Sequence, residues 1–309
     1  MRPLLRPLAA AVVLAATLAP SGCGSPPAPA AVTTAAPGES FPVSIGSLTV
    51  MVAPHRIVSL SPTGTEMLVA VGAGPQVIAV DAGSTLPTGP PVPRLPAGAP
   101  DAAAIAGYQP DLVVIGDDPN RIADQLRLMK IPTFQAGPAG TLDDTYRELG
   151  QLGQLTGHSV QATAVSQRMR TDIDALIQAL PPRNRSLTYY YELDRNYGSL
   201  TGRTFVGSLF SLAGLTNIAD PVGSGSNSHP QLSVQLVVNA NPDLIFLADT
   251  ACCGQTATAV AVRAGWSGLT AVKTGGVISL DRNLAAGWGP HVVDLLRAIT
   301  DAVGRVPLA

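Results

Sequence analysis

The sequence predicts an α/β protein: two Rossmann-like lobes with mostly parallel sheets, joined by one long rigid helix, with a ligand cleft between the lobes. Three observations predict this fold. Short apolar runs alternate with stretches of helical periodicity along both halves of the chain. The segment QPDLVVIGDD at 109–118 returns as NPDLIFLADT at 241–250. A long stretch without Gly or Pro separates the two copies.

That stretch, Ser159–Leu180, predicts the linking helix. Its apolar residues recur at three- and four-residue spacing, which places them on one helix face. Ser159 is the expected N-cap, and Pro181-Pro182 ends the helix because proline cannot continue it. A helix of this length would be a rod of roughly 33 Å. We therefore assign 41–157 to an N-terminal lobe, 158–181 to the linking helix and 182–309 to a C-terminal lobe.

The chain begins with the pattern of a targeting segment. Arg2 and Arg6 precede the apolar run Leu8–Leu18, and residues 1–22 are predicted to be a signal peptide. The junction before Cys23 resembles a bacterial lipobox, although Pro20 departs from it. This pattern favours a lipoprotein lipidated at Cys23, on the outer face of the cytoplasmic membrane, and plain secretion is the alternative. The Pro/Ala-rich segment 23–40 is predicted to be a disordered tether.

Composition narrows the function classes. Of 309 residues, 46% are hydrophobic, which suffices for a real core, and only 13% are charged, with a net charge of −2. A nucleic-acid-binding protein would need a basic face, so this balance argues against that class.

The N-terminal lobe is predicted element by element. A hairpin is expected at 41–52, and the Pro-rich segment 86–100 is expected to be a surface crossing. Asp101 is an expected helix cap, and Thr141 with Asp144 forms an expected capping box. Strands are predicted at 57–60, 76–81, 109–118 and 131–137, and helices at 66–71, 101–108, 121–130 and 141–157.

The C-terminal lobe repeats the alternation. Strands are predicted at 186–194, 241–250 and 275–281, and helices at 202–214, 233–240 and 289–304. A Pro-Asp before a strand is common, but the same pattern in corresponding places of two halves indicates two related lobes.

Ligands of open parallel sheets bind beyond the carboxyl ends of the strands, so candidate ligand-binding residues are sought there. Each of them, taken singly, also fits an ordinary turn residue. They are Ser61, Pro62, Thr63, Asp81 and Asp117 in the first lobe, and Tyr191, Asp249, Cys252, Cys253, Arg282 and Trp288 in the second.

Two further features keep alternatives open. Tyrosines cluster at 189–197, where alternate residues of a strand share a face, so they fit either core positions or a stacking wall for a flat ligand. Arg203 fits either a partner for a ligand carboxylate or phosphate, or a solvated turn arginine.

Cys252 and Cys253 are neighbours in a chain predicted to lie outside the cytoplasm, where thiols tend to be oxidised. Neighbouring Cα atoms are about 3.8 Å apart, below the usual spacing of about 4.4–6.8 Å for a disulfide. A strained vicinal disulfide, a soft metal-ligand pair and two inert buried thiols are the three interpretations.

Enzyme signatures are missing from the sequence. Gly265-Trp266-Ser267-Gly268-Leu269 fails the serine-hydrolase elbow, and there is no phosphate-loop lysine motif. The four histidines have no metal-ligand spacing. We therefore expect no catalytic residue, no resident metal and no cofactor of its own.

Several segments together resemble one family. RIVSLSPTGTE, the two Pro-Asp strands, AVRAGWSGLTAVKTGGVISLD and GPHVVDLL are similar to the periplasmic binding proteins for iron-siderophore, haem and vitamin B12, the helical-backbone solute-binding proteins of ABC importers. The resemblance covers about residues 41–309. It implies a monomer that holds a metal chelate or corrinoid between two lobes and delivers it to a permease, with membrane contact only through the lipid anchor. By this analogy Arg203 joins the candidate ligand-binding residues.

One departure concerns docking. Members of the family commonly carry a glutamate on each lobe that pairs with permease arginines, and Ala103 and Gln235 occupy those places here. Glu66, Asp101 and Glu192 are the candidate substitutes. The alternative function is therefore an envelope lipoprotein that binds or senses a similar ligand without an importer.

Overall fold

The computed structural model describes residues 40–87, 91–96, 101–118, 120–223, 225–281, 284 and 287–307, except the side chains of 251 and 252. These residues belong to one compact unit. The predicted signal peptide and Cys23 lie outside the described residues, as do Arg282 and all of the predicted tether except Ser40.

A five-stranded parallel sheet forms the N-terminal half, in the order β5-β4-β3-β6-β7. Strands β3 and β6 are almost wholly buried, which explains their continuous apolar sequences. The predicted hairpin is present as β1 and β2, paired antiparallel. The strands are β1 (Val43–Ile45), β2 (Leu48–Val50), β3 (Ile57–Leu60), β4 (Val77–Asp81), β5 (Arg94–Leu95), β6 (Leu112–Ile115) and β7 (Thr133–Gln135), and the helices are α1 (Pro62–Ala70), the 3₁₀ turn η1 (Gly74–Gln76), α2 (Ala102–Gly107), α3 (Ile122–Leu128) and α4 (Leu142–Thr156).

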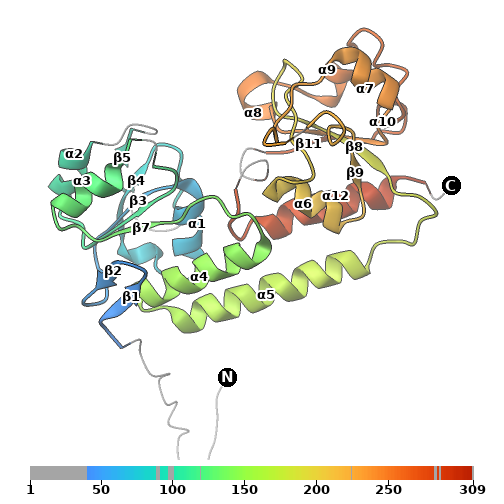
Figure 1. The fold of residues 1–309 in the computed structure, drawn as a ribbon. Helices are drawn as coiled ribbons and strands as arrows, with labels where there is room; N and C mark the ends of the chain where they lie inside the picture. The colour runs from blue at the N-terminus through green and yellow to red at the C-terminus, as the bar shows by residue number, and fades with distance from the viewer. Residues whose placement is uncertain are drawn as a thin grey trace, which may run out of the picture. The chain divides into compact units, whose positions relative to one another are not determined.

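A four-stranded parallel sheet forms the C-terminal half, in the order β11-β10-β8-β9. The predicted α/β class with parallel sheets is therefore confirmed in both halves (Figure 1). The strands are β8 (Thr188–Glu192), β9 (Thr216–Asn217), β10 (Leu244–Leu247) and β11 (Val277–Ser279), and the described helices are α6 (Phe205–Leu212), α7 (Val234–Ala240), α8 (Thr250–Cys253), α9 (Ala257–Ala261), α10 (Thr270–Lys273) and α12 (Val292–Arg305).

The two copies of the Pro-Asp segment occupy corresponding places. β6 pairs with β3, the first strand of its sheet in the chain, and β10 pairs with β8 in the same way. The aspartate of each copy holds the start of that first strand. Asp111 accepts hydrogen bonds from the backbone N–H groups of His55 and Arg56, and Asp243 accepts one from the backbone N–H of Thr188. The repeated sequence thus reflects a repeated structural task.

The linking helix is α5 (Ser159–Gln178), and it runs unbroken from one half to the other (Figure 1). Its N-cap is His158, not the predicted Ser159, because the chain leaves α4 through Gly157 in the left-handed conformation and enters α5 at once. It packs along α4 and α12, and its buried residues Ala162, Met169 and Ile173 belong to the spacing that predicted it.

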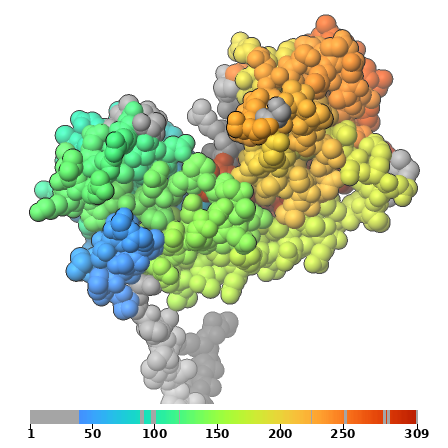
Figure 2. All heavy atoms as spheres, viewed as in Figure 1, coloured from blue at the N-terminus to red at the C-terminus, as the bar shows by residue number. Residues whose placement is uncertain are grey.

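One large core cluster joins the two halves. It contains residues of β3 and β6, the inner faces of α4 and α5, residues of β8 and β10, and the apolar face of α12. Smaller clusters cover the other face of each sheet. In the space-filling view, the residues of the blue hairpin lie against green α4 on one face of the molecule (Figure 2).

Several elements differ from the prediction. Helix α1 begins at Pro62, because Ser61 caps it and proline fits the first helical position. The helix predicted at 66–71 is therefore corrected to a longer helix, Pro62–Ala70, that is capped by Ser61. Strands β5 and β9 and helices α8, α9 and α10 were not predicted. Among the described residues, no helix combines the length and apolar character needed to cross a membrane.

Candidate functional site

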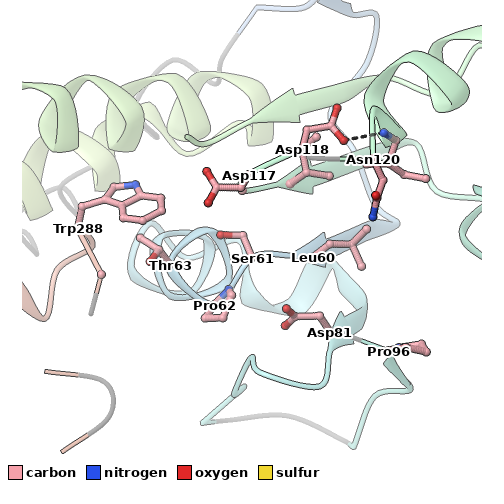
Figure 3. A pocket seen from close by; sticks show the side chains of 14 residues that line it. Leu60, Ser61, Pro62, Thr63, Asp81, Pro96, Asp117, Asp118, Asn120 and Trp288 are labelled. Carbon is pink, nitrogen blue, oxygen red and sulfur yellow. Dashed lines mark hydrogen bonds between the residues drawn. The ribbon is translucent and has the colours of Figure 1, made fainter. Parts of the chain in front are cut away.

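A pocket of about 380 Å³ lies at the carboxyl ends of β3, β4 and β6. We call it the strand-end pocket. It is built mainly by the N-terminal sheet, and Gly287 and Trp288 contribute from the chain that follows β11 (Figure 3). Its described lining residues are Leu60, Ser61, Pro62, Thr63, Asp81, Pro96, Ile115, Gly116, Asp117, Asp118, Asn120, Ile122, Gly287 and Trp288.

The turn from β3 into α1 forms the middle of this pocket. The hydroxyl of Ser61 accepts a hydrogen bond from the backbone N–H of Gly64 at 3.0 Å, so it caps the helix. Gly64 lets the helix approach β6, since a Cβ there would lie 2.8 Å from Val114 Cγ1. The amino end of α1, with Pro62 and Thr63, lines the strand-end pocket.

Carboxylates flank this turn on both sides. Asp81 lies at the end of β4 and Asp117 and Asp118 lie after β6, with Ser61 between them (Figure 3). Asp81 is 7% exposed, whereas Asp117 is exposed. Asp118 accepts hydrogen bonds from the backbone N–H groups at the start of α3, at 2.6 and 3.1 Å. No Lys, Arg or His is among the described lining residues, so the charged groups of the described lining are all carboxylates, set among mainly apolar residues.

Trp288 forms the opposite edge. Its indole Nε1 donates a hydrogen bond to Glu148 Oε2 on α4, at 2.9 Å. Burial raises the pKa of Glu148 to about 6, although the bond from Trp288 acts in the other direction. This bond ties the segment after β11 to the N-terminal half and fixes the indole at the pocket rim.

Glu66 on α1 holds the same segment a second time. Its Oε1 accepts a hydrogen bond from the backbone N–H of His291 at 2.6 Å and lies 2.6 Å from His291 Nδ1. Burial lowers the pKa of His291, but Glu66, with Asp294 and Asp281, together outweigh it, so the net shift is upward. The carboxylate of Glu66, a predicted docking residue, is therefore already bound to His291 of the same chain. Both residues line an adjoining pocket of about 290 Å³, which shares Pro62 and Thr63 with the strand-end pocket.

The other predicted residues lie elsewhere. Tyr191 is fully buried in the core, where its ring packs edge-on against Phe210. The Arg203 guanidinium donates to the backbone carbonyls of Gly223 and Asn227. Asp101 caps α2 and is exposed. The structure thus brings Ser61, Pro62, Thr63, Asp81, Asp117 and Trp288 together and does not bring Tyr191, Arg203 or Asp249 to the same pocket.

At the carboxyl end of β8, Glu192 forms an internal ion pair. Arg263 donates to both carboxylate oxygens of fully buried Glu192, at 2.6 Å each, and lies over the ring of Trp266. Burial and the neighbouring Glu192 raise the pKa of Asp249 to about 6. Cys253, in α8, is disulfide-bonded, and the side chain of Cys252 lies outside the described part.

Sequence reasoning missed two residues that shape these regions, Arg263 and Glu148, because neither belongs to a motif. It included Trp288 among the candidates but gave no hint that this indole meets α4. Among the described residues, no group of three His, Cys, Asp or Glu side chains is placed to hold a metal ion.

Known proteins resemble the whole chain. A cobalamin-binding protein of Halobacterium salinarum is 31% identical over 306 residues, covering 94% of this chain and 82% of that protein. An uncharacterized ABC transporter substrate-binding lipoprotein of Bacillus subtilis is 24% identical and covers 95% of each chain.

Solved structures share the fold. The periplasmic heme-binding protein HutB of Vibrio cholerae matches with a TM-score of 0.71 at 21% identity, covering 80% of this chain and 97% of that one. The periplasmic vitamin B12 binding protein BtuF of Vibrio cholerae matches with a TM-score of 0.68 at 23% identity, covering 81% and 97%. The sequence profile described as periplasmic binding protein matches residues 57–284. The chain therefore belongs to the periplasmic binding protein family, a family of solute-binding proteins, as its sequence predicted.

Proposed function

We propose that this protein is an extracytoplasmic solute-binding protein that captures a corrinoid of the vitamin B12 type and delivers it to an ABC importer. The observation that carries the proposal is the likeness to the cobalamin-binding protein of Halobacterium salinarum, at 31% identity over 94% of the chain. Ligand capture is assigned to the strand-end pocket and the adjoining pocket, which share Pro62 and Thr63 and so form one continuous surface.

The chemistry of the pocket supports a corrinoid over the other ligands of the sequence-based hypothesis. Ferric siderophores and haem carry anionic groups, which favour Arg or Lys partners, and the described lining residues contain neither. Haem iron also takes an axial ligand from His, Cys, Met or Tyr. None of these is among the described lining residues of the strand-end pocket, and His291 of the adjoining pocket is already paired with Glu66. Trp288 offers a flat apolar face at the rim, suited to a macrocycle.

The test is a thermal-shift screen of the full chain against cyanocobalamin, hemin and several ferric siderophores. A ligand that binds only the folded state stabilises it by mass action and so raises Tm. The free energy of unfolding rises by about 2.7 kcal/mol at a free ligand concentration of 100 Kd. We expect cyanocobalamin to raise Tm, with one-to-one binding by calorimetry. A rise with hemin or a siderophore and none with cyanocobalamin would overturn the corrinoid assignment.

Coupling to an importer is the second half of the proposal. The name of the Bacillus subtilis relative supports it, whereas Ala103 and Gln235 stand at the places of the family's docking glutamates. We propose that exposed Asp101 takes part in docking on the N-terminal half, and that lipidation of Cys23 anchors the protein to the membrane. An envelope binding protein without an importer is the alternative, favoured by those two missing carboxylates.

Reconstitution distinguishes the two functions. Candidate permease–ATPase complexes in proteoliposomes are assayed for uptake of labelled cyanocobalamin with and without this protein. Stimulated uptake that falls with Asp101→Ala supports importer coupling. Intact ligand binding without capture by any permease would support the alternative.

A further inference from the structure

We infer that Asp81 determines which corrinoids the pocket accepts: its carboxylate receives hydrogen bonds from carboxamide groups of the ligand and disfavours ligands that carry carboxylates there. The inference rests on the proposed function, because it specifies the chemistry of the same pocket. A ligand of this class is a fully amidated corrinoid, as opposed to the corresponding polycarboxylic acid.

The first observation is the burial of Asp81. Only 7% of the residue is exposed, and it lines the strand-end pocket. Its Oδ1 is fully covered and has no hydrogen-bond partner among the described residues. A buried polar atom without a partner is costly, and a buried charge more so. Such an atom is rare in a folded protein and calls for a specific explanation.

The residues around Asp81 explain why no described protein group donates a hydrogen bond to its Oδ1. Pro62 and Pro96 border the pocket beside Asp81, and proline has no backbone N–H to donate (Figure 3). The nearby charged side chains of the pocket, Asp117 and Asp118, are themselves acceptors. The remaining polar side chains of the described lining are Ser61, Thr63 and Asn120, and none of them is hydrogen-bonded to Asp81 Oδ1. The Ser61 oxygen already accepts the helix-cap bond. We therefore assign the missing donors to the ligand.

Another buried carboxylate of this chain shows the contrast. Glu192 is fully buried and receives two hydrogen bonds from Arg263 at 2.6 Å. This buried carboxylate, which lies away from the strand-end pocket, is accompanied by a guanidinium. Asp81 has no such partner, and its location at the ligand space indicates that its partner arrives with the ligand.

The expected selectivity follows from the two kinds of ligand group. A primary carboxamide offers two N–H donors to Asp81 and a carbonyl to the hydroxyl of Thr63. A carboxylate offers only lone pairs, and its charge would repel Asp81, Asp117 and Asp118 together. Sites built to hydrogen-bond a ligand group reject analogues that lack it, because their own buried atoms stay unpaired.

The test uses calorimetric titration of the full chain with cobinamide and with cobyrinic acid, whose ring carries carboxylates in place of the amides. Wild-type protein should bind cobinamide more tightly by at least about ten-fold, the discrimination expected from one charged hydrogen bond. Asp81→Asn should reduce that ratio by about ten-fold, since an amide can donate to a ligand carboxylate. Asp301→Asn, the same charge change on an exposed residue of α12, should leave the ratio unchanged.

The Tm of the unliganded variants distinguishes ligand recognition from a structural role of Asp81, since loss of a structural role would lower it. Because Asp81 lacks a partner before ligand binds, Asp81→Asn should keep or raise the Tm of the unliganded protein, and the stabilisation by cobinamide should shrink. A lowered Tm of the unliganded variant, or an unchanged ligand ratio with cobinamide still bound, overturns the inference and leaves the proposed function standing. Failure of wild-type protein to bind either corrinoid overturns both.

Discussion

At the scale of single residues, the hydrogen-bond partners of a buried carboxylate indicate its role. Asp243 receives the Arg185 guanidinium and the backbone of Thr188, and its pKa is lowered because these hydrogen bonds outweigh burial. Glu148 has a neutral donor, Trp288, and its pKa is raised. Asp81 has no partner for its covered oxygen and faces the pocket. The first two hold the fold together, and the third is available to a ligand.

Glu148→Gln tests the residue-scale account through pH. The pKa of Glu148 is about 6 in the folded protein, above the ordinary value of 4.5. The folded state therefore binds this proton more tightly than the unfolded state, and stability falls as pH rises from 4.5 to 6. Glutamine keeps an acceptor for Trp288 and cannot ionise. We expect the variant to be more stable than wild type at pH 7.5, on the order of 1–2 kcal/mol.

Urea unfolding at pH 4.5 and pH 7.5 measures this effect. The advantage of the variant should be present at pH 7.5 and absent at pH 4.5, where the wild-type carboxyl is protonated in the folded state. An equal stability difference at both pH values would contradict a protonation origin.

The sequence predicted several residues of the strand-end pocket but also included two that lie elsewhere, Tyr191 and Arg203. Ser61, Asp81, Asp117 and Trp288 were placed among the candidates because strand ends in parallel sheets converge, and the structure brings them to one pocket. The same rule included Tyr191, yet alternate residues of a strand point to opposite faces, and the sequence does not say which face α6 will cover. Arg203 illustrates the second limit, because its carbonyl partners are 20 or more positions away.

At the scale of elements, the contact between α4 and α5 depends on one small residue. A Cβ at Gly153 would lie 2.4 Å from Ala162 Cβ and 3.1 Å from the carbonyl oxygen of His158. Both contacts involve parts of α5 or its cap that cannot move without shifting the helix. Close packing of the linking helix on α4 therefore requires glycine at this position.

Gly153→Ala should lower the free energy of unfolding by about 1–3 kcal/mol, the usual cost of overpacking. Gly150→Ala is the matched control on the same helix, because nothing lies within 4 Å of a Cβ there. Removing that glycine should stabilise the protein by about 0.4–1 kcal/mol. Chemical denaturation of both variants checks the pair, and equal effects at the two positions would refute the tight contact.

Elements were predictable where several local features agreed. The capping box of Thr141 and Asp144, the cap at Asp101 and the apolar spacing of α5 each combine a start or stop residue with periodicity, and all three are present. Strands β5 and β9 are two residues long and helices α8 to α10 are four or five. Such short elements lack a readable period, and tertiary contacts define them. His158 replaced Ser159 as the cap because the α4–α5 corner, not local propensity, sets that boundary.

At the scale of the whole molecule, the repeated Pro-Asp strands predicted the architecture best. They marked corresponding strands in two parallel sheets, and the unbroken α5 between them is the predicted linking helix. The two halves nevertheless differ at their strand ends. The N-terminal sheet leaves a pocket of about 380 Å³ whose described lining includes three carboxylates, whereas Glu192, at the end of β8, is paired with Arg263. The fold is repeated, but the strand-end pocket is built mainly on one half.

The proposed corrinoid site lies at the carboxyl ends of β3, β4 and β6, against Trp288. A crystal structure of the chain with cyanocobalamin would locate the ligand. We expect the corrin ring beside Trp288 and the amino end of α1, with a side-chain amide nitrogen of the ligand within hydrogen-bond distance of Asp81. A ligand bound at another surface, with the pocket between Ser61 and Asp117 empty, would rule out this site.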